Sequence, residues 1–255
     1  MFYQTEHVAA ADHFKREEGE NFSYPLHIHR CFELILVTAG EMRVTAGKRE
    51  RTAKAGDAVL IFPHLPHALS SCNSRHVLFI FSSELIRAFH VKYAEKLPET
   101  AFFRPEPALF AALCGLKEDD SPFRMKGLLY SAAAAALEGQ TAFRDRAEEN
   151  DLLQKIFLYA DKNCLSGAGL SDLARSLGYE KFYLSRYFKN TTGVTYNDYL
   201  NGLKTGHAAD LLRSTKKSVL DCALESGYQS LRSFNRNFRR RFGCSPAAYR
   251  AAVRR

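Results

Sequence analysis

The C-terminal part of this chain contains one sequence pattern twice. The stretch that starts LARSLGYEKFYLSRYF at Leu173 returns as CALESGYQSLRSFNRNF from Cys222, first at an offset of 49 positions and then, after one inserted residue, at 50. The matched pairs are Gly178 and Gly227, Arg186 and Arg236, Phe188 and Phe238, and Gly193 and Gly243. A duplication of this period requires one structural unit that is used twice.

The first copy has the signals of two short helices around a tight turn. Ser171 is expected to cap the first helix, and Gly178 to end it, because glycine adopts the left-handed conformation that a sharp turn needs. Leu184 and Phe188 lie four residues apart, as on the buried face of a second helix that Gly193 closes.

The second copy repeats these signals with different residues. Ser218 and Asp221 form a capping-box pattern, Gly227 supplies the turn, and Phe234 and Phe238 form the buried pair. Each copy therefore predicts a helix-turn-helix, a unit that places its second helix in the major groove of DNA.

The faces opposite the buried pairs carry side chains that suit DNA. Arginine can read guanine, asparagine can read adenine, and an apolar side chain can contact the thymine methyl group, whereas cations further along the helix suit phosphates. The candidate DNA-binding residues are Phe182, Ser185, Arg186 and Lys189 in the first copy, and Leu231, Arg232, Asn235, Arg236, Arg239 and Arg240 in the second, with Arg241 beside them. The alternative is a pair of solvated charged faces, but two matched helices with arginine at the same place favour DNA.

The net charge of +8 is concentrated in the same part of the chain. Residues 151–255 carry 18 Lys and Arg against 8 Asp and Glu, which gives +10, whereas residues 1–150 carry 18 against 20, which gives −2. A domain with this excess is expected to meet a polyanion, most simply double-stranded DNA, although a basic domain can also be merely soluble.

The segment between the copies, residues 195–214, predicts a long helix. Nineteen helical residues span about 28 Å. Successive major grooves on one side of DNA lie about 34 Å apart. One chain is therefore expected to read two grooves without dimerising.

The C-terminal region resembles the DNA-binding domain of the arabinose-regulator (AraC/XylS) family of bacterial transcription factors. The motifs that carry the resemblance are LARSLGY with LSRYFK, A-x-x-LL at Ala208 to Leu212, and the terminal G-x-S-P-x-x-Y-R. The resemblance implies base contacts by residues 182, 185, 186, 231, 232, 235 and 236. It also implies a small-molecule effector, a homodimer on DNA and transcription activation by contact with RNA polymerase.

The second copy and the linker each depart from the family pattern. Cys222 in the second copy stands where the family usually has isoleucine, and Thr205 stands where the linker usually has leucine or isoleucine. Gly202 and Gly206 each weaken a helix by up to about 1 kcal/mol relative to alanine. These residues lead us to expect a less rigid linker.

The N-terminal part predicts β-structure followed by helices. Short β-branched and aromatic runs within residues 26–81 are expected to end at Gly40, Gly47, Gly56 and Pro63, which favours a sandwich or small barrel. Helices are expected from Ser83 and from Ser121. The second helix has an apolar stripe that fits either a core or, as is usual in the family, a dimer seam; it comprises Met125, Leu128, Leu129, Ala132, Ala136 and Leu137.

We therefore predict an α+β multidomain chain. A cupin-like β-barrel that senses the effector is expected at 1–82, a helical dimerisation or connector region at 83–139, a linker at 140–150, and an all-α DNA-binding domain with two helix-turn-helix motifs at 151–255.

His27, His29 and Glu33 form an H-x-H-x3-E pattern that resembles the first cupin motif. His67 takes the fourth ligand position of the second motif. Three positions depart from these motifs: Asn21 and His64 replace glycines, and Phe62 replaces a proline. His64 is a fifth possible ligand or a donor to an anionic effector, and Cys31 and Cys72 are weaker candidates.

Two interpretations of this pocket remain open. Three imidazoles and a carboxylate suit Zn, Ni, Mn or Fe, and cupin dioxygenases and isomerases use such sets. Alternatively, these side chains are structural, as in many regulators of the family. A duplicated helix-turn-helix has no use in an enzyme, so we expect a ligand- or metal-responsive regulator with no catalytic residues.

The remaining bulk features favour the cytoplasm. The six cysteines are scattered without a C-x-x-C pair, the N-terminus is too polar for a signal peptide, and no run of 18 apolar residues occurs.

Overall fold

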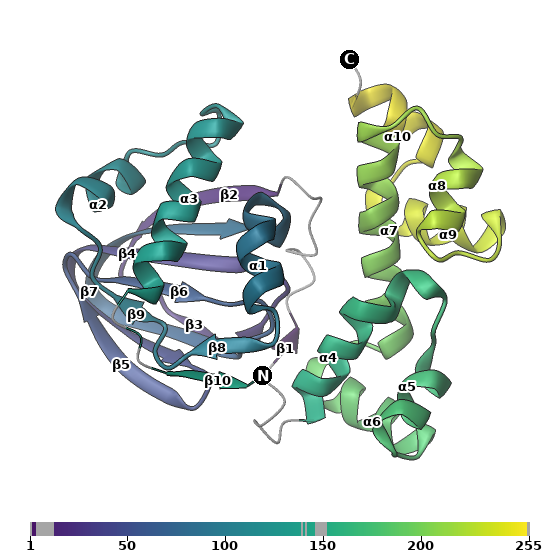
Figure 1. Ribbon diagram of the computed structural model, residues 1–255, viewed down its shortest axis with the longest axis horizontal. Helices are drawn as coiled ribbons and strands as arrows, with labels where there is room; N and C mark the ends of the chain where they lie inside the picture. The colour runs from purple at the N-terminus through teal and green to yellow at the C-terminus, as the bar shows by residue number, and fades with distance from the viewer. Residues whose placement is uncertain (1, 4–12, 139, 141, 146–151, 254–255) are drawn as a thin grey trace. The chain divides into compact units, whose positions relative to one another are not determined.

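The computed structural model describes residues 2–3, 13–138, 140, 142–145 and 152–253. The chain divides into two compact units, Met1–Asn150 and Asp151–Arg255, and each is described by itself (Figure 1).

The first unit is built on an eight-stranded sheet in which strands far apart in sequence pair. Its strands are β1 (Phe2–Tyr3), β2 (Phe14–Glu20), β3 (Tyr24–Ile28), β4 (Phe32–Ala46), β5 (Arg49–Lys54), β6 (Ala58–Ile61), β7 (His67–Phe81) and β9 (Phe102–Phe103). The pairs are antiparallel apart from β1 with β3, and a small second sheet pairs β8 (Lys96–Pro98) with β10 (Phe143–Asp145). The long strands β4 and β7 pair along most of their length.

The predicted break at Gly40 is wrong. The strand β4 runs through it, and the register against β7 shifts between Val37 and Ala39 and again between Glu41 and Arg43. Gly40 has φ +65°, and a Cβ there would lie 2.0 Å from the carbonyl oxygen of Asn73. Glycine therefore lets this strand bend at an irregular position instead of ending it.

The strand β2 was not predicted, and its composition explains why. Its sequence FKREEGE is mostly charged, and it pairs with β7 at the margin of the sheet. Charged side chains are typical of sheet edges, so the strand lacks the apolar alternation by which strands are predicted.

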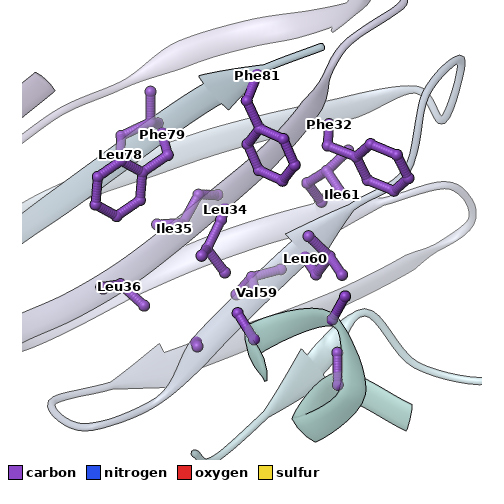
Figure 2. Close-up of a cluster of buried hydrophobic side chains, with 14 of the residues drawn as sticks. Phe32, Leu34, Ile35, Leu36, Val59, Leu60, Ile61, Leu78, Phe79 and Phe81 are labelled. Atoms are coloured by element: carbon purple, nitrogen blue, oxygen red, sulfur yellow. The ribbon is translucent and has the colours of Figure 1, made fainter. Parts of the chain in front are cut away.

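Helices cover the sheet, and the apolar stripe of α3 faces the core. They are η2 (Ser83–Ile86), α1 (Arg87–Tyr93), α2 (Pro107–Cys114), which was not predicted, and α3 (Pro122–Leu137). Met125, Leu129, Ala132 and Ala136 are buried, and Leu128 and Leu137 pack against the same cluster. The dimer-seam interpretation of this stripe is therefore wrong. Figure 2 shows the strand side of this core, where Phe32 of β4 stacks on Phe81 of β7 at 5.5 Å between ring centroids.

The second unit is helical and contains both predicted helix-turn-helix motifs. Its elements are α4 (Leu152–Asn163), η3 (Cys164–Ser166), α5 (Leu170–Leu177), α6 (Lys181–Thr192), α7 (Tyr196–Ser214), α8 (Val219–Glu225), α9 (Leu231–Phe242) and α10 (Pro246–Val253). The α+β class and the two motifs, α5–α6 and α8–α9, are confirmed. The segment between them is the continuous helix α7, as predicted.

The first helix of each motif, α5 and α8, has a different N-terminal cap. The capping box of Ser218 and Asp221 is confirmed at the start of α8. The expected cap at Ser171 is wrong, because the cap is Gly169, two residues earlier, and Ser171 lies inside α5. Glycine has no side chain to accept from the first turn, but the backbone N–H of Gly169 donates to Asp172 Oδ2 at 3.0 Å.

Candidate functional site

The second helices of the two motifs are oriented by buried apolar pairs. Leu184 and Phe188 on α6 are fully buried, as are Phe234 and Phe238 on α9. Phe157 of α4 packs edge-on against Phe188 at 5.7 Å. Because one side of each helix is fixed inward, the opposite side faces solvent.

The structure places the candidate DNA-binding residues on these exposed sides. Phe182 is 83% exposed and Leu231 39%, large values for apolar side chains. Ser185 is half-buried. The exposed polar members are Arg186 and Lys189 on α6, and Arg232, Asn235, Arg236, Arg239 and Arg240 on α9.

Two arginines at the end of α9 are engaged with α7. An Arg240 nitrogen donates to Asp198 Oδ1 at 2.8 Å, although both side chains stay about half exposed. Arg241 donates to the carbonyl of Gly202 and to Thr205 Oγ1. The guanidinium groups of Arg240 and Arg241 therefore both tie α9 to the linker helix α7.

Further polar contacts hold α7 against the second motif, and no sequence pattern indicated them. The hydroxyl of Tyr228 donates to the carbonyl of Asn201 at 3.4 Å, and Asn237 donates to the Asn201 side chain at 3.0 Å. Lys204 Nζ donates to the carbonyl of Gly227 at 3.0 Å. These bonds counteract the flexibility expected from Gly202, since they fix the linker from outside the helix.

In the N-terminal unit, the structure brings four of the five candidate pocket residues together. They come from β3, the turn after it, β4 and β7: His27, His29, Glu33 and His67. Each is at least 98% buried, and one potential ligand atom from each lies within 4.8 Å of the others. With bonds of about 2.1 Å, a tetrahedral metal keeps its ligands about 3.4 Å apart and an octahedral one keeps trans ligands about 4.2 Å apart, so the four atoms would have to draw together by roughly 1 Å to hold an ion.

His64 is buried but lies outside this group. Its backbone has φ +62° and its N–H donates to the carbonyl of His29 at 2.8 Å. It therefore supports the turn that carries His29. The prediction of a fifth ligand at His64 is not supported by this geometry. Cys31 and Cys72 also lie outside the group, and burial raises the pKa of the Cys31 thiol to about 12.

Backbone carbonyls orient the three imidazoles of the group. The Nδ1 atoms of His27, His29 and His67 lie 3.0, 3.1 and 2.8 Å from the carbonyl oxygens of Pro25, Cys31 and Leu65. A carbonyl can only accept, so each Nδ1 carries the proton of a neutral ring and each Nε2 presents a lone pair.

The Nε2 atoms of two rings meet the carboxylate. His29 Nε2 and His67 Nε2 lie 3.0 and 3.3 Å from Glu33 Oε2. Burial lowers the pKa of His29, and it lowers that of His27 to about 3, which favours the neutral rings. Burial raises the pKa of Glu33, but the positive charge of His67 and the hydrogen bonds that His29 and His67 donate when Nε2 carries a proton outweigh it and lower the pKa, which keeps the carboxylate ionised.

This arrangement fits a cation. With its one proton on Nδ1, a neutral ring turns the lone pair of Nε2 toward the Glu33 carboxylate, and either a second proton or a metal ion must satisfy that contact. Glu33 Oε1 is also buried without a hydrogen-bond partner among the described residues. A divalent ion bound to Nε2 atoms and to the carboxylate would satisfy all of these groups. The group is therefore able to hold a metal.

Comparison with known proteins agrees with this division. Residues 13–154 match the family described as an AraC-like ligand binding domain, and residues 173–252 match a helix-turn-helix domain. Among the described residues, no helix is both long and apolar enough to cross a membrane.

Three relatives show similarity over shorter regions. The chain is 35% identical to the transposon Tn10 TetD protein of Escherichia coli over 44% of this chain and 80% of that protein. It is 33% identical to the regulatory protein SoxS of Escherichia coli strain K12 over 39% of this chain and 92% of that protein. It is 29% identical to the transcriptional activator AarP of Providencia stuartii over 40% of this chain and 76% of that protein.

Proposed function

The chain belongs to the AraC family of transcriptional regulators, and from this premise we propose that a divalent metal ion in its N-terminal unit controls how its two reading helices bind DNA. The regulator itself, with a ligand-binding domain followed by a DNA-binding domain, follows from the family. The identity of the ligand and the roles of individual residues are our proposal.

The DNA-binding half of the proposal rests on the two exposed helix faces. Phe182, Ser185 and Arg186 would face bases in one major groove, and Leu231, Arg232, Asn235 and Arg236 in the next. Lys189, Arg239 and Arg240 would contact phosphates. The 19 residues of α7, about 28 Å of helix, suit the spacing between successive grooves.

One observation carries the sensing half: three buried imidazoles, each with Nδ1 against a backbone carbonyl, converge on one buried carboxylate. His27, His29, Glu33 and His67 would hold the ion, and nitrogen-rich sets of this kind suit Zn, Ni, Mn or Fe. Bound metal would shift the population of states in which the DNA-binding unit can engage its site.

The partners follow the family pattern. We propose a homodimer on a promoter with two half-sites, activation by contact with RNA polymerase, and action in the cytoplasm. We propose that the metal group senses rather than catalyses, so the protein should bind DNA without consuming a substrate. An organic effector that binds at the metal is compatible with this function.

Elemental mass spectrometry of the purified full-length protein tests the proposal, alongside DNA-binding titrations with and without the ion. We expect about one divalent metal per chain. His67→Ala and Glu33→Gln should lose it, whereas His64→Ala, which removes a buried histidine outside the group, should keep it. Metal addition should change DNA affinity in the wild type and leave both metal-free variants unchanged.

Two results would overturn parts of this function. If the wild type takes up no ion after loading with each of the four metals, the proposed metal site is wrong, and the search would turn to organic effectors. Stoichiometric metal without any effect on DNA binding would leave a structural or catalytic metal site, and substrate turnover would then become the test.

A further inference from the structure

An open groove of about 830 Å³ runs beside the exposed face of α9. Its lining comprises Val219, Asn235, Arg236, Arg239, Arg240, Ser245, Pro246 and Ala247. Arg240 is paired with Asp198, but in the described part of the chain neither Arg236 nor Arg239 has an acidic partner. A concave surface with three guanidinium groups suits an anion with several acceptor oxygens.

The duplication provides an internal comparison for this groove. In the first motif, the positions of Arg236, Arg239 and Arg240 are occupied by Arg186, Lys189 and Asn190, so three cations become two. The first motif also has Asp198 where the second has Ala248. Counted over these four positions, the first motif carries +2 − 1 = +1 and the second carries +3.

The position of Asp198 relative to its motif is well defined. Its carboxylate accepts from Thr195 Oγ1 at 2.7 Å, and its backbone N–H donates to the same hydroxyl at 3.1 Å. The second motif has the equivalent backbone bond, from Ala248 N to Ser245 Oγ at 3.2 Å, but no carboxylate. Because Ser245 lines the groove, an acidic side chain at 248 would put a negative charge at its wall.

We propose that the groove between α9 and the start of α10 is a seat for a DNA backbone phosphate, and that the first motif lacks the equivalent seat because it has the carboxylate of Asp198 where the second motif has Ala248. The inference rests on the proposed DNA-binding function and assigns different roles to the two motifs. The second motif binds the DNA backbone mainly through its positive charge. The first motif reads its groove more through uncharged side chains, with Phe182 and Tyr183 exposed at 83% and 51%.

The substitution Ala248→Asp tests the seat, with Ala248→Asn as its matched control. Ala248 is exposed, and an acidic residue three positions after a serine cap stabilises a helix start, so the variant should fold. Asparagine has almost the same size without the charge. Affinities of the full-length variants would be measured over a NaCl series, for a duplex selected from a random library and for a scrambled duplex.

We expect Ala248→Asp to weaken binding to both duplexes and to reduce the slope of log K against log salt by about 1, the loss of one phosphate contact. Ala248→Asn should match the wild type. Asp198→Asn, which keeps a capping side chain, should strengthen binding to both duplexes and steepen the slope, because it removes the carboxylate and releases Arg240.

The possible outcomes distinguish a failure of the phosphate seat from a failure of the proposed DNA-binding function. Equal affinities and slopes for Ala248→Asp and Ala248→Asn would overturn the phosphate seat, as would an Asp198→Asn variant that behaves like the wild type. A wild type that binds no duplex at any salt concentration would instead refute the DNA-binding function itself.

Discussion

Asn21 and His64 adopt a backbone conformation that most side chains avoid. Their φ angles are +52° and +62°, and they occupy the two positions at which the cupin motifs have glycine. Asparagine and histidine are among the residues that tolerate this region best. Both residues thus hold a conformation that glycine adopts most easily.

A substitution at Asn21 should separate the conformational role from the hydrogen bond. Asn21→Ala should lower the free energy of unfolding by about 1–2 kcal/mol, because it combines a left-handed φ with loss of the bond from Ser74 N to Asn21 Oδ1, 3.2 Å long. Asn21→Gly loses only the bond and should cost less. Urea denaturation of both variants checks the order, and equal losses would mean that φ is not the cause.

Arg236 provides a test of direct base reading. Arg236→Ala should relax discrimination at one base position by about 1–3 kcal/mol while leaving the other positions unchanged. Binding to a set of single-base variants of a selected duplex measures this. Weakening that is the same for every sequence would assign Arg236 to a phosphate instead.

At the scale of elements, the sequence predicted the helical unit better than the sheet. Both motifs and α7 were predicted because glycines, caps and buried pairs recur at fixed spacing. In the sheet, Gly40 indicated an end where the strand only bends, and β2 was hidden by its charged composition. Both errors come from pairing between distant strands, which local patterns do not record.

The candidate site was predictable to a similar degree. Sequence spacing singled out His27, His29, Glu33 and His67, and the structure brings their ligand atoms together. It could not indicate that His64 stays apart, because that depends on a backbone turn. The hydrogen bonds from Arg241 and Asn237 to α7 also depend on how the helices dock, as does the bond from Lys204 on α7 to the turn before α9.

The two matched turns should respond unequally to the same substitution. Gly178 and Gly227 have φ +72° and +77°, so alanine costs about 1–2 kcal/mol at either position. At Gly227 the added Cβ would also lie 2.8 Å from the carbonyl oxygen of Leu165, whereas nothing lies within 4 Å at Gly178. Gly227→Ala should therefore lower the melting temperature more, and an equal loss would show that the crowding relaxes freely.

At the scale of the whole molecule, the chain consists of two units with separate cores. The large cluster around β4 and β7 lies in the first, and a smaller one around Phe234 and Phe238 lies in the second. The charge is divided in the same way, with +10 in residues 151–255 and −2 in residues 1–150.

Separate cores predict separate responses to metal. Calorimetry of the full-length protein should show two transitions, and metal should raise only that of the N-terminal unit, since the group lies within its sheet. At a free concentration about 100 times the dissociation constant, the added stability is about 2.7 kcal/mol. Glu33→Gln should abolish the shift, and a rise in both transitions would indicate that the units unfold together.

The carbonyl that orients each buried histidine lies two residues away along the chain: Pro25 for His27, Cys31 for His29 and Leu65 for His67. The direction of each ring is thus set within a tripeptide, while the pairing of strands, such as His27 opposite His67, brings the rings together. Over evolutionary time, residues that line the rest of the pocket can change, and with them the molecule that the protein detects. The three imidazoles would continue to converge on the same point, so new specificities can arise without rebuilding the site.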